Sequence, residues 1–316
     1  MSALTVAVIG GGAAGFFAAL TAKERHPDAA VTLFEKSGKL LSKVKISGGG
    51  RCNVTNACAV PRDLVKAYPR GQKLLKKAFR QFHTVDTQAW FEQRGVPLMT
   101  QADHRVFPAS QASQTIIDCF LEEARRLGVS IQTRRGVRRL ERQGARWHLH
   151  FQREHTPLAV DRVIVATGGS PKVQGLQWLA ELGHRITPPV PSLFTFNLPD
   201  APLVRQLMGG SGDPVLTRLQ GAPWQGSGAL LLTHWGMSGP AVLQLSAFGA
   251  RWLAERQYQA TLEVSWANDT NQERVRDHLR HLAQAQASKQ LSNYRPYALP
   301  DRLWQYLHQT SGLPAQ

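Results

Sequence analysis

The sequence contains few cysteines and no long hydrophobic run. Its three cysteines, Cys52, Cys58 and Cys119, show no even or regular spacing, which argues against the disulfide framework of a small secreted protein. The apolar start of the chain is broken by glycines, and no basic residue precedes Lys23, so it does not match a signal peptide. No other stretch is long and apolar enough to span a bilayer. We therefore expect a cytoplasmic protein without a membrane segment.

Acidic residues are also scarce, with 22 Asp and Glu against 38 Lys and Arg and a net charge of +16. This excess favours a polyanionic partner, either nucleic acid or an anionic membrane surface. A basic surface that only maintains solubility is the alternative. No histidine lies at ligand spacing from cysteines or carboxylates, so we expect no metal site.

The chain has 316 residues and is 42% hydrophobic, which is enough for two domains. Its start predicts a βαβ unit, with a strand over residues 4–9, a helix over 13–25 and a strand over 31–35. After Pro188 prolines cluster and β-like segments follow, which predicts a second domain over residues 189–316. The remaining predicted helices cover residues 74–82, 116–127, 272–286 and 301–308. Alternating segments near 131–133, 137–140 and 147–151 suggest a small β-meander, and the remaining strands lie near 162–166, 193–198, 229–233 and 261–266.

A dinucleotide-binding fingerprint occupies the first predicted turn. Gly10 permits the tight turn, Gly12 lets the backbone approach a pyrophosphate, and Gly15 lets the helix pack closely on the strand. The start of the helix then supplies N–H donors and the positive end of a dipole. Glu35 ends the next strand, where a carboxylate accepts hydrogen bonds from ribose hydroxyls and repels a 2′-phosphate. FAD or NAD therefore fits better than NADP.

Two further glycine-rich segments favour FAD over NAD. Residues 163–169 form an apolar strand that ends in Thr-Gly-Gly, as in many flavoproteins with two dinucleotide folds. An ordinary strand-to-loop glycine pair is the alternative for this segment. Residues 45–56 contain three consecutive glycines whose N–H groups can form an anion-binding concavity. Arg51 adds a bidentate fork for phosphate, and Asn53 and the polar residues after it can reach a flavin ring.

The glycine fingerprint, together with residues 47–56, 105–108, 166–169 and 231–244, resembles a family of bacterial flavoproteins. That family includes bile-acid-type ene-reductases and the synthase that makes dihydrouridine in large-subunit ribosomal RNA. The resemblance covers nearly the whole chain, and residues 231–244 are its most diagnostic part. It implies an α/β fold: a Rossmann-like FAD-binding domain of the two-dinucleotide-fold type over residues 1–188, and an inserted domain, β-rich and then helical, over 189–316.

The resemblance also implies an activity. Reduced FAD would deliver a hydride to an activated carbon–carbon double bond, with NAD(P)H as a transient electron donor. Our leading hypothesis is reduction of uridine to dihydrouridine in large-subunit ribosomal RNA, and the second is reduction of a small conjugated acid or enone. Family members continue into a C-terminal segment that returns to the FAD domain, whereas this sequence stops at Gln316. A non-catalytic FAD- or RNA-binding remnant is therefore the third hypothesis.

Two residues are candidates for proton transfer. Cys52 follows Arg51, whose charge would lower the pKa of the thiol; the alternative is a small residue packed in a tight turn. His234 precedes a Gly-Met-Ser-Gly-Pro turn and could transfer a proton or contact substrate; the alternative is a role in stabilising the turn. A redox disulfide between Cys52 and Cys58 is disfavoured by their spacing. The predicted cofactor-binding residues are Gly10, Gly12, Ala13, Ala14, Gly15, Glu35, Lys36, Ser47, Gly48, Gly49, Gly50, Arg51, Cys52, Asn53, Val137, Ala166, Thr167 and Gly168.

Two basic clusters account for much of the excess charge. Residues 62–80 interleave lysines and arginines with aromatic residues, and residues 125–146 are rich in arginine. Such surfaces suit RNA phosphates and unstacked bases. The alternative is a solvated helix face in the first cluster and strand edges in the second. The oligomeric state is left open.

Overall fold

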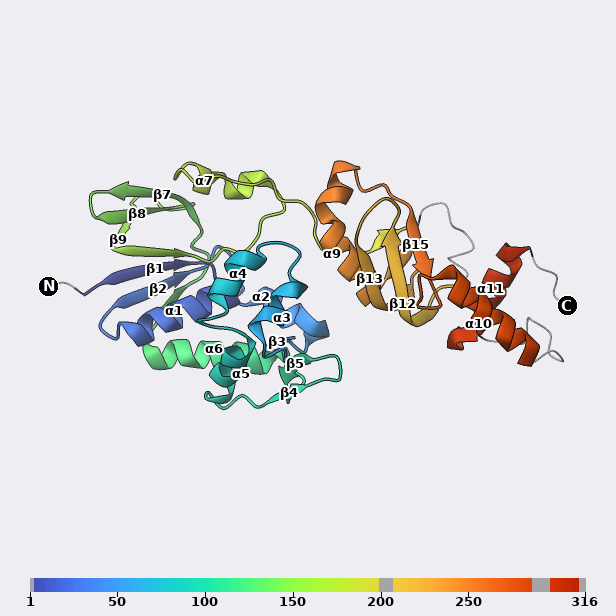
Figure 1. The fold of residues 1–316 in the computed structure, drawn as a ribbon. Helices are drawn as coiled ribbons and strands as arrows, with labels where there is room; N and C mark the ends of the chain where they lie inside the picture. Colours follow the sequence, from blue (N-terminus) through green and yellow to red (C-terminus); the bar gives the residue numbers. More distant parts are fainter. Residues whose placement is uncertain (1–2, 199–206, 286–295, 313–316) are drawn as a thin grey trace. The chain divides into compact units, whose positions relative to one another are not determined.

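The computed structural model describes residues 3–198, 207–285 and 296–312. The chain forms two compact units, Met1–Pro189 and Val190–Gln316, called here the first unit and the second unit (Figure 1). None of the helices in these described ranges is long and apolar enough to cross a membrane.

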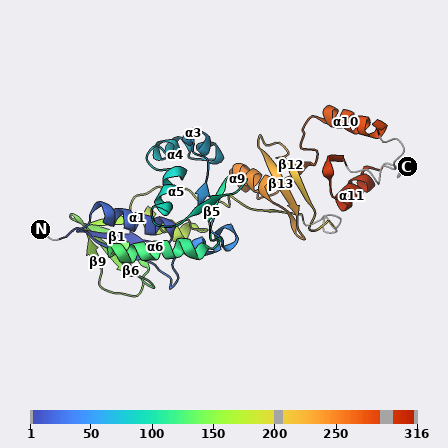
Figure 2. The ribbon, with the colours of Figure 1, turned by 90° about the horizontal axis from the view of Figure 1, so that it is seen from below.

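A parallel sheet forms the centre of the first unit. Its four strands lie in the order β10 (Arg162–Val165), β1 (Thr5–Ile9), β2 (Ala30–Phe34) and β6 (Ser130–Gln132). Two helices, α1 (Ala13–Arg25) and α6 (Ser113–Leu127), lie side by side on one face of this sheet (Figure 1, Figure 2). The βαβ start predicted from the sequence is confirmed, because its apolar strands are buried and its helix begins at Ala13.

The other face of the parallel sheet is covered by an antiparallel sheet. It consists of β7 (Val137–Gln143), β8 (Arg146–Phe151) and β9 (Leu158–Val160). The prediction that residues 131–133 begin this meander is wrong, since Ile131 pairs in parallel with Leu33 of β2. The physical reason is that these residues follow helix α6, whose crossover returns the chain parallel to β2. Apolar residues of both sheets, including Phe34 and Phe151, form the core between them.

A smaller layer of helices and short strands packs beside α1 and α6. It contains the sheet β3 (Thr55–Asn56), β5 (Arg105–Pro108) and β4 (Leu98–Thr100), the helices α2 (Ser42–Ile46), α3 (Pro61–Leu64), α4 (Gln72–Ala78) and α5 (Thr84–Glu92), and the short 3₁₀ turns Ser47–Gly50 and Val65–Ala67. The 3₁₀ turn Val173–Leu176 and helix α7 (Gln177–Ala180) lie instead beside β7, where Trp178 packs on the core of the antiparallel sheet. The predicted helix over 74–82 is wrong in extent, because α4 ends at Ala78. Phe79 instead packs on Tyr68, and Phe82 lies 5.0 Å from the ring of Phe17.

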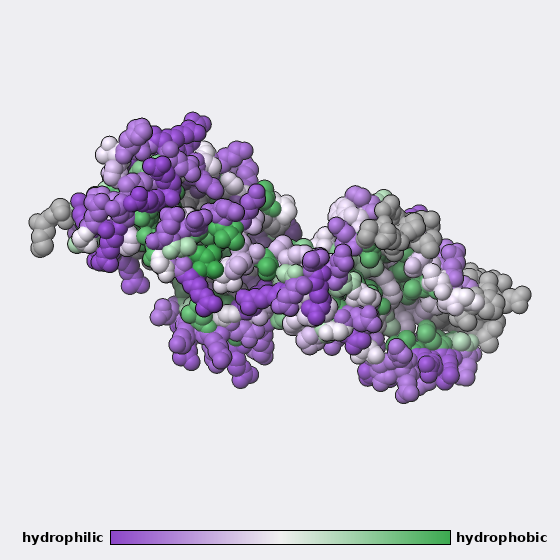
Figure 3. Space-filling view, turned by 90° about the horizontal axis from the view of Figure 1, so that it is seen from above, coloured by the Kyte–Doolittle hydropathy of each residue, from purple (hydrophilic) through white to green (hydrophobic). Residues whose placement is uncertain are grey.

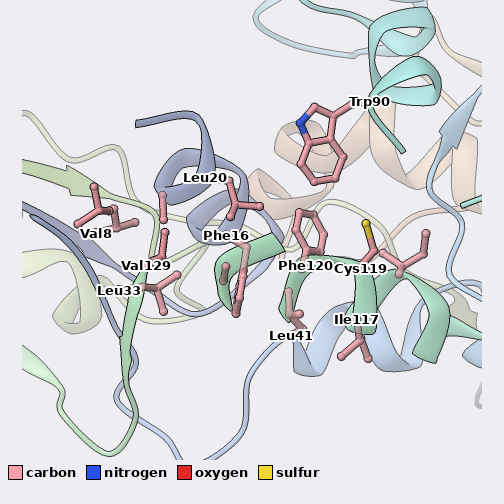
Figure 4. Close-up of a cluster of buried hydrophobic side chains, with 14 of the residues drawn as sticks. Val8, Phe16, Leu20, Leu33, Leu41, Trp90, Ile117, Cys119, Phe120 and Val129 are labelled. Atoms are coloured by element: carbon pink, nitrogen blue, oxygen red, sulfur yellow. The ribbon is translucent and has the colours of Figure 1, made fainter. Parts of the chain in front are cut away.

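An aromatic cluster fixes α1 against α5 and α6. Phe16 of α1 lies 5.8 Å from Phe120 of α6, and Trp90 of α5 lies 5.4 Å from the same ring (Figure 4). Phe16 and Leu20 are fully buried beside them. Each large apolar side chain buried in this way contributes roughly 1.5–3 kcal/mol to stability. The cluster therefore holds the start of α1, and the glycine turn before it, in one position.

The second unit is built on a five-stranded antiparallel sheet. Its strands lie in the order β11 (Phe196–Asn197), β14 (Gly236–Ser238), β13 (Gln225–Leu232), β12 (Ser211–Leu219) and β15 (Leu262–Ser265). Helix α9 (Pro240–Glu255), which the sequence analysis missed, packs on β12 and β13. The 3₁₀ turn Pro296–Ala298 and the helices α10 (Gln272–Ala285) and α11 (Asp301–Ser311) complete the unit. Gln286, predicted to end α10, lies outside the described residues.

Candidate functional site

The two predicted glycine turns lie against each other at the carboxyl ends of β1 and β10. The backbone N–H of Ala166 donates to Ile9 O at 2.8 Å. Gly10 has a φ of +116°, and a Cβ there would collide with the carbonyl of Ala166. A Cβ at Gly15 would collide with the carbonyl of Gly10. Glycine is therefore required at both positions for the turn, the helix and the second turn to approach so closely.

The N-terminus of α1 is open. Gly12 occupies the N-cap position, where no side chain caps the helix and the first turn carries no acidic residue. A Cβ at Gly12 would meet no protein atom within 4 Å. The amides of a first helical turn lack partners within their own helix, and they favour an anion. This end of α1 can therefore receive a phosphate group.

Glu35 lies beside the glycine turn and is ionised. Its Oε2 accepts a hydrogen bond from the N–H of Gly11 at 2.8 Å, and its Oε1 accepts one from the N–H of Ser37 at 2.8 Å. Burial alone would raise its pKa, but these backbone hydrogen bonds, the Ser37 hydroxyl and the charge of Lys36 together lower the pKa. Each carboxylate oxygen keeps a lone pair for a further hydroxyl donor.

The state of Glu35 predicts a pH-dependent effect of Glu35→Gln. Because the folded-state pKa is lowered, the carboxylate stabilises the fold above its unfolded-state pKa of about 4.3, and this contribution is lost as the pH falls through the folded-state pKa. In Glu35→Gln, the side-chain NH₂ group faces one of the two backbone N–H groups, so one of these hydrogen bonds is lost. A protonated Glu35 loses the same bond, because its O–H group is also a donor. Urea unfolding should show Glu35→Gln to be less stable than wild type at pH 7, with a smaller difference at pH 3.5. An equal difference at both pH values would contradict this explanation.

Predicted residues from separate segments line one cavity at the end of β2. This β2 cavity has a volume of about 330 Å³. The predicted residues in its wall are Gly10, Glu35, Lys36, Val137 and Thr167. Gln152 and Trp178 also line it, although neither residue belongs to a motif that predicts cofactor binding. The fold therefore brings together the fingerprint, the acidic residue, the start of β7 and the second glycine turn.

Other predicted residues line a second cavity beside α1. This α1 cavity has a volume of about 440 Å³, and its predicted residues are Ala13, Ala14, Ser47, Cys52 and Asn53. Its remaining wall is mainly apolar, with Phe17, Trp90 and Phe120 among the contributors. Lys43, which the sequence analysis did not select, also lines it. The signal that could have identified Lys43 is its position four residues before Ser47, one helical turn away.

Arg51, in the loop after α2, makes several contacts within the protein. The Nε of Arg51 donates to Gly48 O at 3.2 Å, Nη1 donates to Gln111 Oε1 at 3.2 Å, and the guanidinium lies 4.3 Å from the centre of the Phe107 ring. Arg51 thus supports the loop, and the expected free fork for phosphate is partly used within the protein. Gly48, Gly49, Gly50 and Arg51 line neither cavity, so their contact with a cofactor stays a prediction.

Cys52 is a buried thiol within the α1 cavity. It is 5% exposed. Burial raises its pKa, and a hydrogen bond with Ser47 only partly opposes this. The expectation that Arg51 lowers the pKa of Cys52 is therefore wrong, because the guanidinium is committed to Gly48 and Gln111. Cys52, Cys58 and Cys119 all carry free thiols.

His234 belongs to the second unit, in the turn between β13 and β14. Its ring is exposed and lies edge-on to Trp235, with 4.4 Å between ring centres. The turn is held by Thr233, whose hydroxyl donates to Gly236 O and accepts from Gly236 N, both at 3.1 Å. These bonds assign the turn-stabilising role to Thr233 and leave the imidazole of His234 exposed. Across residues 3–198, 207–285 and 296–312, no group of histidine, cysteine and acidic side chains could hold a metal ion.

The two basic clusters differ in how many of their cations are paired, although Arg125, Arg134, Arg138 and Arg142 of the second cluster have no ion pair with a described residue. In the second cluster, ion pairs join Arg126 to Glu123, Arg135 to Glu154, Arg139 to Glu141 and Arg146 to Asp161. In the first, Lys66 is paired with Asp63. Lys73, Lys76, Lys77 and Arg80 of this cluster are exposed and have no ion pair with any described residue. Hydrophilic residues cover much of both units, around a hydrophobic patch on the first (Figure 3).

Residues 4–312 match the family described as the HI0933-like protein Rossmann domain. A 3-dehydro-bile acid delta(4,6)-reductase from Clostridium scindens is 26% identical over 98% of this chain and 77% of its own length. A ribosomal RNA dihydrouridine synthase from Haemophilus influenzae is 29% identical over 76% of this chain, and the match spans only 60% of that relative. Among solved structures, a flavocytochrome c3 fumarate reductase aligns with 66% of this chain and 47% of its own, at 18% identity and a TM-score of 0.43, which is too low to inform function.

The family match extends over both units, and the fold agrees with it. A parallel sheet, the glycine turn before α1 and the acidic residue after β2 are the parts of a Rossmann-type FAD-binding domain. The chain belongs to the HI0933-like Rossmann family of FAD-binding flavoprotein oxidoreductases.

Proposed function

We propose that this protein binds FAD at the glycine turn, with the two cavities receiving the two ends of the cofactor. The observation that supports this most directly is that predicted residues distant in sequence line both cavities. The open N-terminus of α1 fits the pyrophosphate, and the ionised Glu35 fits the ribose hydroxyls. The apolar wall of the α1 cavity fits a flat ring system. The first unit would then be the FAD domain and the second unit the substrate-side domain.

When bound, FAD supplies hydride chemistry for the reduction of a carbon–carbon double bond. We propose the C5–C6 bond of uridine in large-subunit ribosomal RNA as the substrate, with NAD(P)H as a transient electron donor. The net charge of +16 and the exposed cations of the first basic cluster that lack ion pairs, Lys73, Lys76, Lys77 and Arg80, suit an RNA partner. The dihydrouridine synthase among the relatives supports the same substrate. Since ribosomes are assembled in the cytoplasm, the proposal also places the protein there.

Cys52 and His234 are the proposed proton donors. The raised pKa of Cys52 keeps its thiol protonated at neutral pH, and the thiol lies in the α1 cavity beside Asn53. The exposed imidazole of His234 is the alternative, because no hydrogen bond ties it to another described residue. In either case, the side chain would hold one proton close to the double bond that is being reduced.

The proposed function is tested by the dihydrouridine content of ribosomal RNA from a strain that lacks this gene. We expect the modification to be lost and then restored by the wild-type gene. Complementation with Cys52→Ala or His234→Gln identifies the proton donor, provided that the purified variant keeps its flavin absorbance. An unchanged dihydrouridine content in the deletion strain would overturn the RNA substrate.

A second candidate is reduction of a small conjugated acid or enone. The bile acid reductase among the relatives favours it, and the apolar α1 cavity is large enough for part of such a molecule. NAD(P)H oxidation by the purified protein that depends on an enone, with unchanged ribosomal RNA in the deletion strain, would select this candidate.

A further inference from the structure

Lys43 gives the α1 cavity a positive charge that no described residue neutralises. We propose that the Lys43 ammonium pairs with the negative charge that the flavin ring gains on reduction, and so raises the reduction potential of the bound cofactor. The inference rests on the proposed function, since it requires FAD in this cavity. Lys43 would be a positioning and electrostatic residue, separate from the proton donors.

The position of Lys43 connects the two cavities. Its side chain lines the α1 cavity. Its Nζ also lies 3.9 Å from the position that a Cβ would take at Gly168. Gly168 directly follows Thr167, which lines the β2 cavity. The ammonium group therefore reaches the second glycine turn, which together with the fingerprint is predicted to bind FAD.

The charge of the α1 cavity is carried by Lys43. The only titratable side chains among the residues that line this cavity are Lys43 and Cys52, and the pKa of Cys52 is raised by burial. Arg51, the cation that the sequence pattern favoured, points two of its donors at Gly48 and Gln111 instead. Lys43 makes no hydrogen bond or ion pair through its side chain with any residue in the described part of the chain. Its charge is available to a ligand.

The backbone around Lys43 is held at both ends of α2. Leu41, at the N-cap, is 1% exposed, and its N–H donates to the carbonyl of Gly11 in the fingerprint turn at 2.8 Å. At the other end, the Ser113 hydroxyl donates to Lys45 O at 2.9 Å, which ties α2 to α6. The helix is therefore anchored to the dinucleotide turn, and Lys43 is presented from a fixed position.

An electrostatic role follows from the charge balance of flavin reduction. Hydride transfer from a nicotinamide donor adds two electrons and one proton to the ring, which leaves one negative charge on it, while the nicotinamide is oxidised to its cationic form. An apolar wall disfavours a negative charge, because burial removes it from water. A cation nearby offsets this cost in the reduced form and contributes little to the neutral oxidised ring.

The test compares Lys43→Met with Lys43→Arg and with Lys45→Met, a control on the same helix that does not line the cavity. The dissociation constant for oxidised FAD is measured by flavin fluorescence, and the reduction potential by equilibration with a redox dye. We expect Lys43→Met to weaken binding of reduced relative to oxidised FAD about 10-fold, which corresponds to a potential lower by about 30 mV. Lys43→Arg and Lys45→Met should stay close to wild type.

Three outcomes separate this inference from the proposed function. If wild-type protein does not bind FAD, the proposed cofactor site itself is wrong. If wild type binds FAD and Lys43→Met has an unchanged potential, only the role of Lys43 is wrong. Equal weakening of both redox forms, or complete loss of FAD with normal binding by Lys43→Arg, would assign Lys43 to the pyrophosphate and would also overturn the inference.

Discussion

Gly15→Ala should lower the free energy of unfolding by about 1–3 kcal/mol and abolish detectable FAD binding. The added methyl group would collide with the carbonyl of Gly10. Relief of this collision requires α1 to move away from the turn, yet Phe16 and Leu20 hold the helix in the buried core. The loss of stability and the loss of FAD binding therefore have the same cause, because both follow from the increased distance between α1 and the glycine turn. Urea unfolding and flavin fluorescence titration measure them separately.

Gly12→Ala is the matched control for this prediction. A Cβ at Gly12 meets no protein atom within 4 Å, and its φ of −94° suits alanine. We therefore expect unchanged stability. The methyl group would nevertheless occupy the space in which a pyrophosphate approaches the helix, so FAD affinity should still fall more than about 10-fold. Normal FAD affinity in Gly12→Ala would show that the phosphates do not bind at this turn.

Neutralising the exposed end of the first basic cluster should weaken RNA binding about 100-fold at physiological salt. The variant replaces Lys73, Lys76, Lys77 and Arg80 with glutamine. Each of these cations lacks an acidic partner among the described residues, so each is free to displace counterions from a phosphate. The slope of log K against log[salt] should fall by about 3, as expected for the loss of four single-strand contacts.

The control for this variant removes the same amount of charge from the second cluster. It replaces Arg126, Arg135, Arg139 and Arg146, which are paired with acidic residues. Because these cations are already compensated, RNA affinity and its salt slope should change only slightly. Filter binding or fluorescence anisotropy with a ribosomal RNA fragment measures both variants, and circular dichroism verifies that they fold. Equal losses in the two variants would mean that net charge, and not the α4 surface, drives binding.

Features that depend on local spacing were predictable from the sequence. The first strand, the glycine turn, helix α1 and the position of Glu35 were all predicted, because the turn requires glycine and the buried strands require apolar residues within a few positions of one another. Local patterns were less reliable where tertiary contacts competed with the helical spacing. Residues 79–82 continue the helical spacing of α4, but Phe79 and Phe82 pack elsewhere and the helix ends at Ala78.

The sequence by itself thus determined the βαβ start, the dinucleotide fingerprint and the excess of positive charge. Only the tertiary structure decided that residues 131–133 join the parallel sheet, that Arg51 supports its own loop, and that Lys43 lines the α1 cavity. It also decided which arginines are neutralised, since Arg135 and Arg146 find their acidic partners in other strands or loops. The physical reason is the same in each case: burial, pairing and charge compensation depend on residues that are distant in the chain and become neighbours only on folding.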